Sequence, residues 1–181
     1  MIRYEIWPNL LCLITNLRKN GSWCGATHIQ KAAFIAQELT GARLGLDFRL
    51  YHHGPYSFEL KDVLEELEAA DAIESAPHPP YGPHLEITDK GFGFWGQFED
   101  DNFDPAPFEF VAKKLRGMNV EDLERIGTAF LVAKEMPEAS TGQRAEKLCE
   151  YKSHIALAKS EEAFQTVEQW RQEWASNLIP A

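Results

Sequence analysis

The chain has 181 residues, of which 44% are hydrophobic and 25% charged, and its formal net charge is -10. A chain of this length and composition can bury a core without disulfides or metals, so we expect one compact folded body. The acidic balance argues against strong nonspecific binding of nucleic acid, because that affinity comes from Lys and Arg neutralising phosphates.

The spacing of the cysteines and the lack of a targeting signal indicate where in the cell the protein is found. Cys12, Cys24 and Cys149 are widely spaced and form no Cys-x-x-Cys pair, which is typical of buried thiols in a reducing environment. The first residues lack the basic and apolar regions of a secretory signal, and no apolar run approaches the roughly twenty residues that span a bilayer. We therefore expect a cytoplasmic protein that does not enter the membrane.

Two helices are predicted at the start of the chain. Apolar residues recur every three or four positions over residues 4–17, and Pro8 marks the start of the regular part of this helix. Thr27 and Gln30 then fit a capping box, in which the Thr hydroxyl accepts from the third helical amide and the Gln side chain reaches back. The second helix is expected to end before a C-terminal cap at Gly41.

A short strand and a third helix follow. Residues 48–52 alternate large apolar and polar side chains, which predicts a strand. Gly54-Pro55 is expected to end this strand and open the helix, because proline at the first helical position already has the φ that a helix needs. The apolar stripe beyond it predicts a helix to about Ala70.

The next segments complete a recognisable order of elements. Residues 72–75 and 85–88 flank a proline-rich loop, which predicts two antiparallel strands joined by a long hairpin. The order helix, helix, strand, helix, strand, strand is close to that of a winged helix, with this hairpin as the wing. The predicted fold class is α+β and mainly helical, with a winged-helix-like unit over residues 1–91.

Residues 92–181 are predicted to be a helical region packed on that unit in one compact body. The segment 91–110 is rich in aromatic and acidic residues and has no Lys or Arg, and we expect its aromatic rings to dock onto the first unit.

Helix signals divide the rest of this region. Asn119 is expected to cap a helix that Pro137 breaks, and Ser160 is expected to start the last helix. The apolar stripe of that last helix includes Trp170 and Trp174, and the sequence leaves open whether it is core or a dimer face.

His52 and His53 are the first candidates for catalysis or metal binding, since imidazole titrates near neutral pH. Neighbouring residues of a strand point to opposite faces, so at most one of them is expected in a given site, and no His-x-x-x-His or Cys-x-x-Cys partner lies nearby. We interpret one imidazole as a structural hydrogen-bonding group and the other as exposed. An enzyme centred on either of them is an alternative.

Two other candidate sites have plainer interpretations. A composite zinc site needs distant loops to converge without any sequence signal, and its candidate ligands are Cys24, His28, His78 and His84. Ser57 lies in no Gly-x-Ser-x-Gly elbow and is expected to cap the third helix. We predict no catalytic residue, no metal and no cofactor.

The third helix is acidic. It carries one basic residue, Lys61, and five acids, which are Glu59, Asp62, Glu65, Glu66 and Glu68. In a DNA-reading winged helix this element enters the major groove, where these acids would repel phosphates. The remaining interpretations are a solvated helix face and a docking surface for a basic partner.

Four segments together resemble a known family. They are His28-Ile29-Gln30-Lys31-Ala32-Ala33-Phe34-Ile35, then Phe48-x-x-Tyr51-x-His53-Gly54-Pro55-Tyr56-Ser57, the helix over 60–67, and Leu85-Glu86-Ile87-Thr88-Asp89-Lys90-Gly91. Over about residues 26–91 the chain resembles the SocA-like or Panacea antitoxin domain and its YwgA-like bacterial and archaeal relatives. The resemblance implies a protein-binding module, which in the antitoxin members neutralises a toxin by direct contact. The helical second half and the proline-rich hairpin depart from the antitoxin pattern and point to the YwgA-like branch.

We therefore predict a non-catalytic interaction or regulatory protein, antitoxin-like or associated with phage defence. Its partner is expected to be a protein, such as the product of a neighbouring gene. The predicted partner surface comprises Tyr51, His53, Tyr56, Ser57, Glu59, Asp62, Glu65 and Glu66. The residues expected to shape the junction are Lys31, Phe48, Gly54 and Pro55.

The first alternative is a winged-helix regulator that binds DNA. It requires a basic surface, and the only positive side chains between Gly41 and Gly91 are Arg43, Arg49, Lys61 and Lys90.

Overall fold

The computed structural model describes residues 4–79, 81–97 and 103–178. Over these residues the protein is a mainly helical α+β fold with two small antiparallel hairpins, which confirms the predicted class. None of the described helices combines the length and the apolar character that crossing a bilayer requires.

The first two helices lie close to their predicted positions. A short 3-10 turn, η1 (Tyr4–Ile6), leads into α1 (Trp7–Lys19), which has Pro8 in its first turn as expected. The second helix, α2 (Ala26–Ile35), continues into one π-helical turn, η2 (Ala36–Thr40). Gly41 ends this turn in the left-handed region with φ +74°, so the predicted C-terminal cap is confirmed.

The predicted capping box at Thr27 is wrong. The N-cap of α2 is Gly25, no side chain caps the helix, and Thr27 lies inside the first turn. The Gln30 side chain instead exchanges two hydrogen bonds with the backbone of Ser57: its Nε2 donates to the Ser57 oxygen over 2.9 Å, and the Ser57 amide donates to its Oε1 over 2.8 Å. The side-chain amide of Gln30, which the local pattern assigned to a helix cap, therefore makes a long-range contact with Ser57.

The expected strand-to-helix junction is a hairpin. Strand β1 (Arg49–Tyr51) pairs antiparallel with β2 (Gly54–Tyr56), so the prediction that Gly54-Pro55 opens a helix is wrong. Gly54 has φ +85°, which lets the chain reverse through His52 and His53. The third helix, α3 (Phe58–Ala69), begins after Ser57, whose Oγ accepts from the Leu60 amide over 3.2 Å, as a cap should.

The proline-rich segment is also more regular than predicted. Strands β3 (Ile73–His78) and β4 (Tyr81–Ile87) extend into it and form a ribbon, so the expected long loop is wrong. The register shifts between Ala76 and His78, where Pro77 has no amide to donate. In the described residues β1 pairs with β2 and β3 with β4, and the two hairpins form separate sheets.

The second half of the chain is helical. It contains α4 (Asp89–Gln97), α5 (Ala106–Lys114), α6 (Val120–Glu135), α7 (Thr141–Tyr151) and α8 (Leu157–Asn177). Asn119 and Asp122 form the capping box of α6, which confirms the predicted cap, and α6 ends before Pro137. The last helix starts earlier than predicted, because Ser160 lies inside it and donates to the Ala145 oxygen of α7, a helix that the sequence pattern missed.

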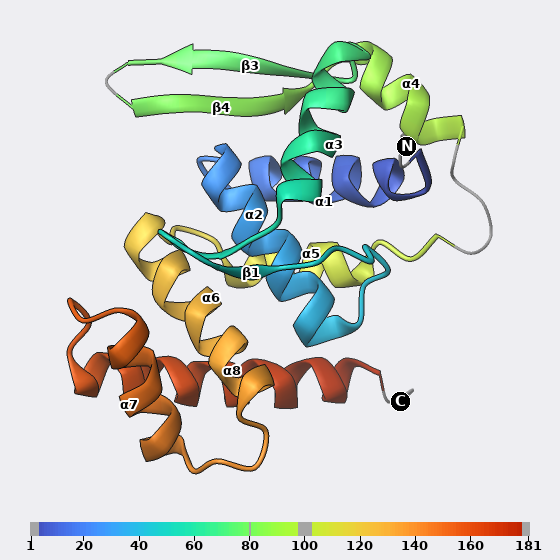
Figure 1. The fold of residues 1–181 in the computed structure, drawn as a ribbon. Helices are drawn as coiled ribbons and strands as arrows, with labels where there is room; N and C mark the ends of the chain where they lie inside the picture. Colours follow the sequence, from blue (N-terminus) through green and yellow to red (C-terminus); the bar gives the residue numbers. More distant parts are fainter. Residues whose placement is uncertain (1–3, 80, 98–102, 179–181) are drawn as a thin grey trace.

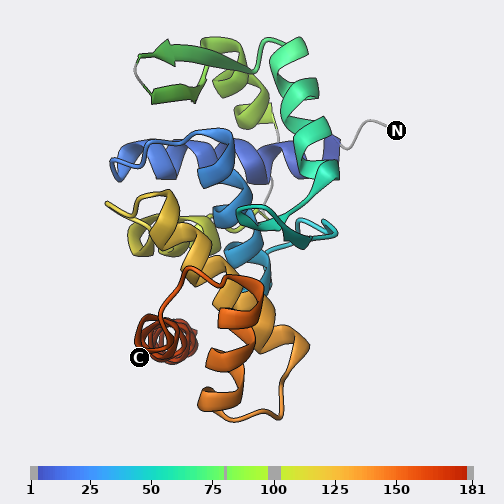
Figure 2. The same ribbon diagram turned by 60° about the vertical axis from the view of Figure 1, so that its left-hand side comes forward.

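The elements are stacked from one end of the molecule to the other. The β3–β4 ribbon and α4 lie at one end, α7 and α8 lie at the other, and α1, α2 and α5 lie between them (Figures 1 and 2). Helix α5 packs against α1, and α6 packs against α2 and β2, so both halves of the chain contribute to one hydrophobic core.

The aromatic residues of the second half belong mostly to this core. Trp170 and Trp174 are buried, with rings 6.1 Å from Phe130 and 5.2 Å from Phe110 respectively, so this stripe is core and offers no dimer face.

Docking of the 91–110 aromatics onto the first unit is confirmed for Phe94, whose ring lies 5.8 Å from that of Trp7. Phe92 is half exposed at a hollow that Ile14 and Ile87 also line, and Phe98 lies outside the described residues.

Gly91 allows the start of α4 to pass close to the connection between α3 and β3. A Cβ atom at this position would lie 2.0 Å from the Ala72 oxygen and 2.8 Å from Ile87 Cγ2. We expect Gly91→Ala to lower the free energy of unfolding by about 2–3 kcal/mol, because the backbone must move to remove the overlap. Urea unfolding measures this change.

Gly93 of the same helix is the matched control. A Cβ atom there meets nothing within 4 Å, so Gly93→Ala should stabilise the helix by about 0.5–1 kcal/mol. Equal effects of the two substitutions would show that the close approach at Gly91 is absent.

Candidate functional site

A buried cluster of three charged residues holds the β1–β2 hairpin against the helices. Lys31 of α2 is 1% exposed, and its Nζ donates to the Pro55 oxygen over 2.8 Å. Lys152, just after α7, forms an ion pair of 2.6 Å with Glu124 of α6 and also donates to the backbone oxygen of His52. The two lysines therefore bind the backbone of both sides of the hairpin, and Glu124 supplies the opposite charge.

Burial changes the acidity of Lys31. Loss of solvent lowers the pKa of its ammonium from 10.5 to about 8; the carboxylate of Glu124 opposes this shift, and the nearby charge of Lys152 adds to it. The cluster thus buries two lysines beside one glutamate, which is a costly arrangement unless every group has hydrogen-bond partners.

Two glycines allow the hairpin to lie directly on α6. A Cβ atom at Gly54 would lie 3.0 Å from Thr128 Oγ1, and one at Gly127 would lie 3.3 Å from the Pro55 ring. The residues that the sequence suggested as junction formers, Gly54 and Pro55, therefore fit the hairpin to α6 and do not start α3.

The hairpin presents a cluster of aromatic rings to solvent. Tyr51 is 47% exposed and Phe58, the first residue of α3, is 58% exposed. The Tyr56 ring lies 5.4 Å from Tyr51 and 5.1 Å from Phe58, and Tyr51 is 5.8 Å from Phe58. We call Tyr51, Tyr56 and Phe58 the aromatic face.

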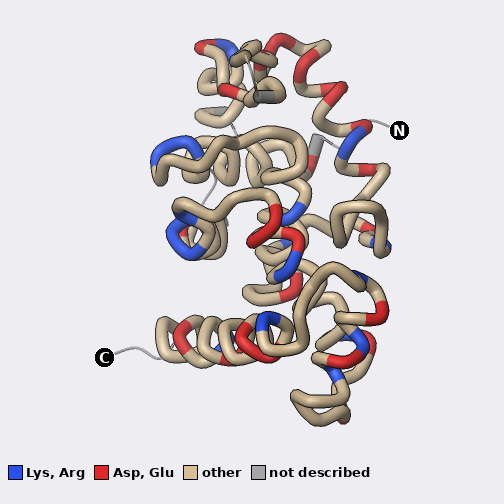
Figure 3. The backbone as a smooth tube through the Cα atoms, turned by 90° about the vertical axis from the view of Figure 1, so that its left-hand side faces the viewer, with Lys and Arg blue, Asp and Glu red and all other residues tan. Residues whose placement is uncertain are grey.

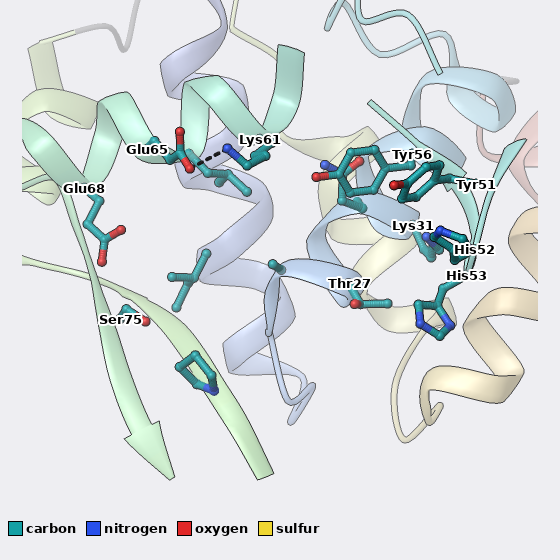
Figure 4. Close-up of a pocket in the computed structure, with 15 residues that line it drawn as sticks. Thr27, Lys31, Tyr51, His52, His53, Tyr56, Lys61, Glu65, Glu68 and Ser75 are labelled. Atoms are coloured by element: carbon teal, nitrogen blue, oxygen red, sulfur yellow. Dashed lines mark hydrogen bonds and ion pairs between the residues drawn. The ribbon is translucent and has the colours of Figure 1, made fainter. Parts of the chain in front are cut away.

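A cleft of about 510 Å³ opens beside the aromatic face. Helix α2 contributes Thr27 and the end of Lys31, the hairpin contributes the rings of Tyr51 and Tyr56, and α3 and the β3–β4 ribbon form the other walls (Figure 4). Figure 4 shows Glu65 and Glu68 on the α3 side of the cleft, opposite the tyrosines and histidines of the hairpin.

Acidic residues recur along α3 (Figure 3). Asp62, Glu65 and Glu68 are exposed, whereas Glu59 and Glu66 are partly buried. Lys61 is paired with Glu65 over 2.6 Å, so the exposed surface of this helix stays acidic.

Some residues of the predicted partner surface lie at the cleft, and another is buried. Tyr51, His53, Tyr56 and Glu65 line the cleft. Ser57 is fully buried as the cap of α3, so it positions the surface without being part of it. Phe48 packs on Phe34 of α2, with ring centroids 5.1 Å apart, and so anchors the start of β1.

The expectation that only one of His52 and His53 can join a given site is wrong. The two are the turn residues of the hairpin and not strand neighbours, and both line the cleft. His53 Nδ1 lies 3.9 Å from Glu124 Oε2, but its side chain is 66% exposed, and Glu124 is already paired with Lys152.

The candidate zinc ligands whose side chains are described form no metal-binding group. Cys24 and His28 are buried, and burial raises the pKa of the Cys24 thiol to about 12 and lowers that of His28. The His84 ring packs edge-on against Trp23, and the His78 side chain lies outside the described residues. Among described residues, no group of three or more His, Cys, Asp or Glu side chains could hold a metal ion.

Sequence reasoning missed Glu124 and Lys152. Each reads as an ordinary charged residue of a helical region, and nothing local marks it as buried. The available signal was Lys31, a lysine at a core-facing position between the apolar residues Ile29 and Phe34.

Comparisons with known proteins name no family for this chain: no protein-family model matches it, and no curated protein matches it.

Removing the carboxylate of the cluster should be strongly destabilising. Glu124→Gln keeps the size of the side chain but leaves Lys31 and Lys152 without an opposite charge. We expect it to lower the free energy of unfolding by about 3 kcal/mol or more, as for other broken buried pairs. Glu121→Gln, at an exposed position of the same helix, should change stability by less than about 0.5 kcal/mol. Similar values for the two variants in urea unfolding would contradict a structural role for the cluster.

The lowered pKa of Lys31 predicts a pH dependence of stability. Between about pH 8 and pH 10.5 the unfolded chain holds the Lys31 proton while the folded protein has lost it, so stability rises with pH in this window. Relative to Lys31→Met, which cannot titrate, the wild type should gain up to about 3 kcal/mol across the window. Urea unfolding of both proteins at a series of pH values measures the difference. A constant difference would show that Lys31 keeps an ordinary pKa.

Proposed function

We propose that this protein is a non-catalytic interaction protein of the cytoplasm, antitoxin-like or defence-associated, which binds a protein partner through the aromatic face and α3. In this proposal residues 1–91 form a winged-helix-like unit, and residues 92–181 support it. The observation that carries the proposal is the aromatic face itself. Large aromatic rings are among the residues that dominate binding energy at protein interfaces. Here they lie on and beside a hairpin whose backbone is clamped by hydrogen bonds from Lys31 and Lys152.

The clamp supports the proposal because binding is stronger when the surface is ordered beforehand. A two-stranded hairpin is marginally stable alone. Here Lys31 and Lys152 bind its backbone and Gly54 fits it to α6, so little conformational entropy remains to be lost when a partner binds.

Charge indicates the kind of partner. The aromatic face continues into α3, whose exposed Asp62, Glu65 and Glu68 outnumber Lys61. Complementary charges steer association and select partners, so a basic protein surface fits best.

One observation favours the alternative of a DNA-binding regulator. The last turns of α1 and α5 each carry two basic residues, Arg18 and Lys19 in α1 and Lys113 and Lys114 in α5, and positive charge gathers on one side of the molecule in Figure 3. Part of this charge is neutralised, because Arg18 pairs with Glu86 and Lys114 with Glu173. The acids of α3 also oppose its entry into a DNA groove, so this alternative ranks second.

The aromatic face offers a direct test of the proposed function. The protein is co-expressed with the products of adjacent genes, and the Kd of any complex is measured for the wild type, Tyr51→Ser and Phe58→Ser. Each substitution should weaken binding by about thirtyfold, the effect of removing an interface hot spot of about 2 kcal/mol. Phe92→Ser is the control, because Phe92 is an exposed ring of α4 outside the aromatic face.

Two outcomes would contradict the proposal. One is a complex that tolerates Tyr51→Ser and Phe58→Ser as well as Phe92→Ser. The other is the absence of any complex together with binding to duplex DNA that weakens as salt rises, which would support the DNA-binding alternative.

A further inference from the structure

We propose that the cleft beside the aromatic face holds a short peptide segment of the partner, in which an apolar side chain is followed or preceded by Lys or Arg. This inference rests on the proposed function and specifies the chemistry of the partner.

The cleft is formed by side chains from α2, the β1–β2 hairpin, α3 and the β3–β4 ribbon. On α3, residues Lys61, Leu64, Glu65 and Glu68 recur every three or four positions and so share one face of the helix. On the ribbon, Ser75 and Leu85 are register partners, and both line the cleft. A volume of about 510 Å³ is within the range of sites that enclose small ligands or a few peptide side chains.

Much of its lining is apolar. Leu64, Leu85, Ala26 and Pro83 line it, and so do the rings of Tyr51 and Tyr56. Such a surface binds an apolar side chain by removing both from water.

Its α3 wall is acidic. Glu65 is engaged by Lys61, but Glu68 is exposed and forms no ion pair with any described residue. The other lysine of the lining, Lys31, is buried and already donates to the Pro55 oxygen. The carboxylate that remains available at this wall is complementary to a Lys or Arg of the partner.

The test uses linear peptides, so it does not depend on knowing the partner. A library of random 12-residue peptides is selected against the whole protein, and the enriched peptides are synthesised and titrated. We expect them to carry Lys or Arg next to Leu, Phe or Trp, and to lose affinity as salt rises. Glu68→Lys should weaken their binding at least about tenfold, whereas Asp62→Lys, at an exposed position that does not line the cleft, should change it less than about twofold.

A second pair of variants tests the ribbon wall. Ser75→Arg adds bulk and positive charge inside the cleft and should abolish binding. Glu74→Arg is the control, because neighbouring residues of a strand point to opposite faces. Both positions are exposed, so neither change disturbs the core.

The inference is overturned if the wild type enriches no peptide beyond the level found when the Ser75→Arg variant is the target. It is also overturned if the enriched peptides are acidic, or if Glu68→Lys leaves their affinity unchanged. Phe58 does not line the cleft, so Phe58→Ser should leave peptide binding unchanged. A partner complex that depends on Phe58 but tolerates Glu68→Lys and Ser75→Arg would therefore refute the cleft alone and leave the proposed function intact.

Discussion

The hydrogen bonds and ion pair among Lys31, Glu124, Lys152 and the hairpin backbone are the interaction on which the rest of the candidate site depends. Burying two ammonium groups with one carboxylate is costly, and apolar residues of the same size would often be at least as stable. What apolar residues could not supply is donors for the backbone oxygens of Pro55 and His52. The cluster thus fixes a hairpin that is too short to be stable alone.

Fixing the hairpin determines two surfaces at once. The rings of Tyr51 and Tyr56 lie beside Phe58 in the aromatic face, and the same two rings form one wall of the cleft that α3 and the ribbon complete. Ser57 links the two, because its backbone binds Gln30 of α2 while its hydroxyl caps α3. The buried polar groups position the proposed interaction surface, and the exposed groups are the ones proposed to contact a partner.

The elements that could be predicted from the sequence are those that local chemistry determines. A capping box of Asn119 and Asp122 begins α6, and the left-handed Gly41 ends the second helix. Both rely on contacts within a few residues, and the predicted caps at Asn119 and Gly41 are confirmed. Gly54-Pro55 was misinterpreted because proline suits both the start of a helix and a strand position whose amide donates no hydrogen bond. Packing of Gly54 and Pro55 against α6 favours the strand. The charged cluster was beyond sequence reasoning, since Lys152 binds a carbonyl 100 residues away. The proposed function and the cleft ligand remain predictions.

The central claim is that the buried cluster orders the hairpin, and amide hydrogen exchange of the hairpin tests it most directly. In the wild type, the amides of the paired residues Tyr51, Gly54 and Tyr56 should exchange slowly, at rates near those of the core helices. In Glu124→Gln, under conditions where the protein stays folded, their exchange should speed up while α1 and α5 remain protected. Hairpin amides that exchange as fast as an unstructured chain in the wild type, or that are unaffected by the substitution, would contradict the account.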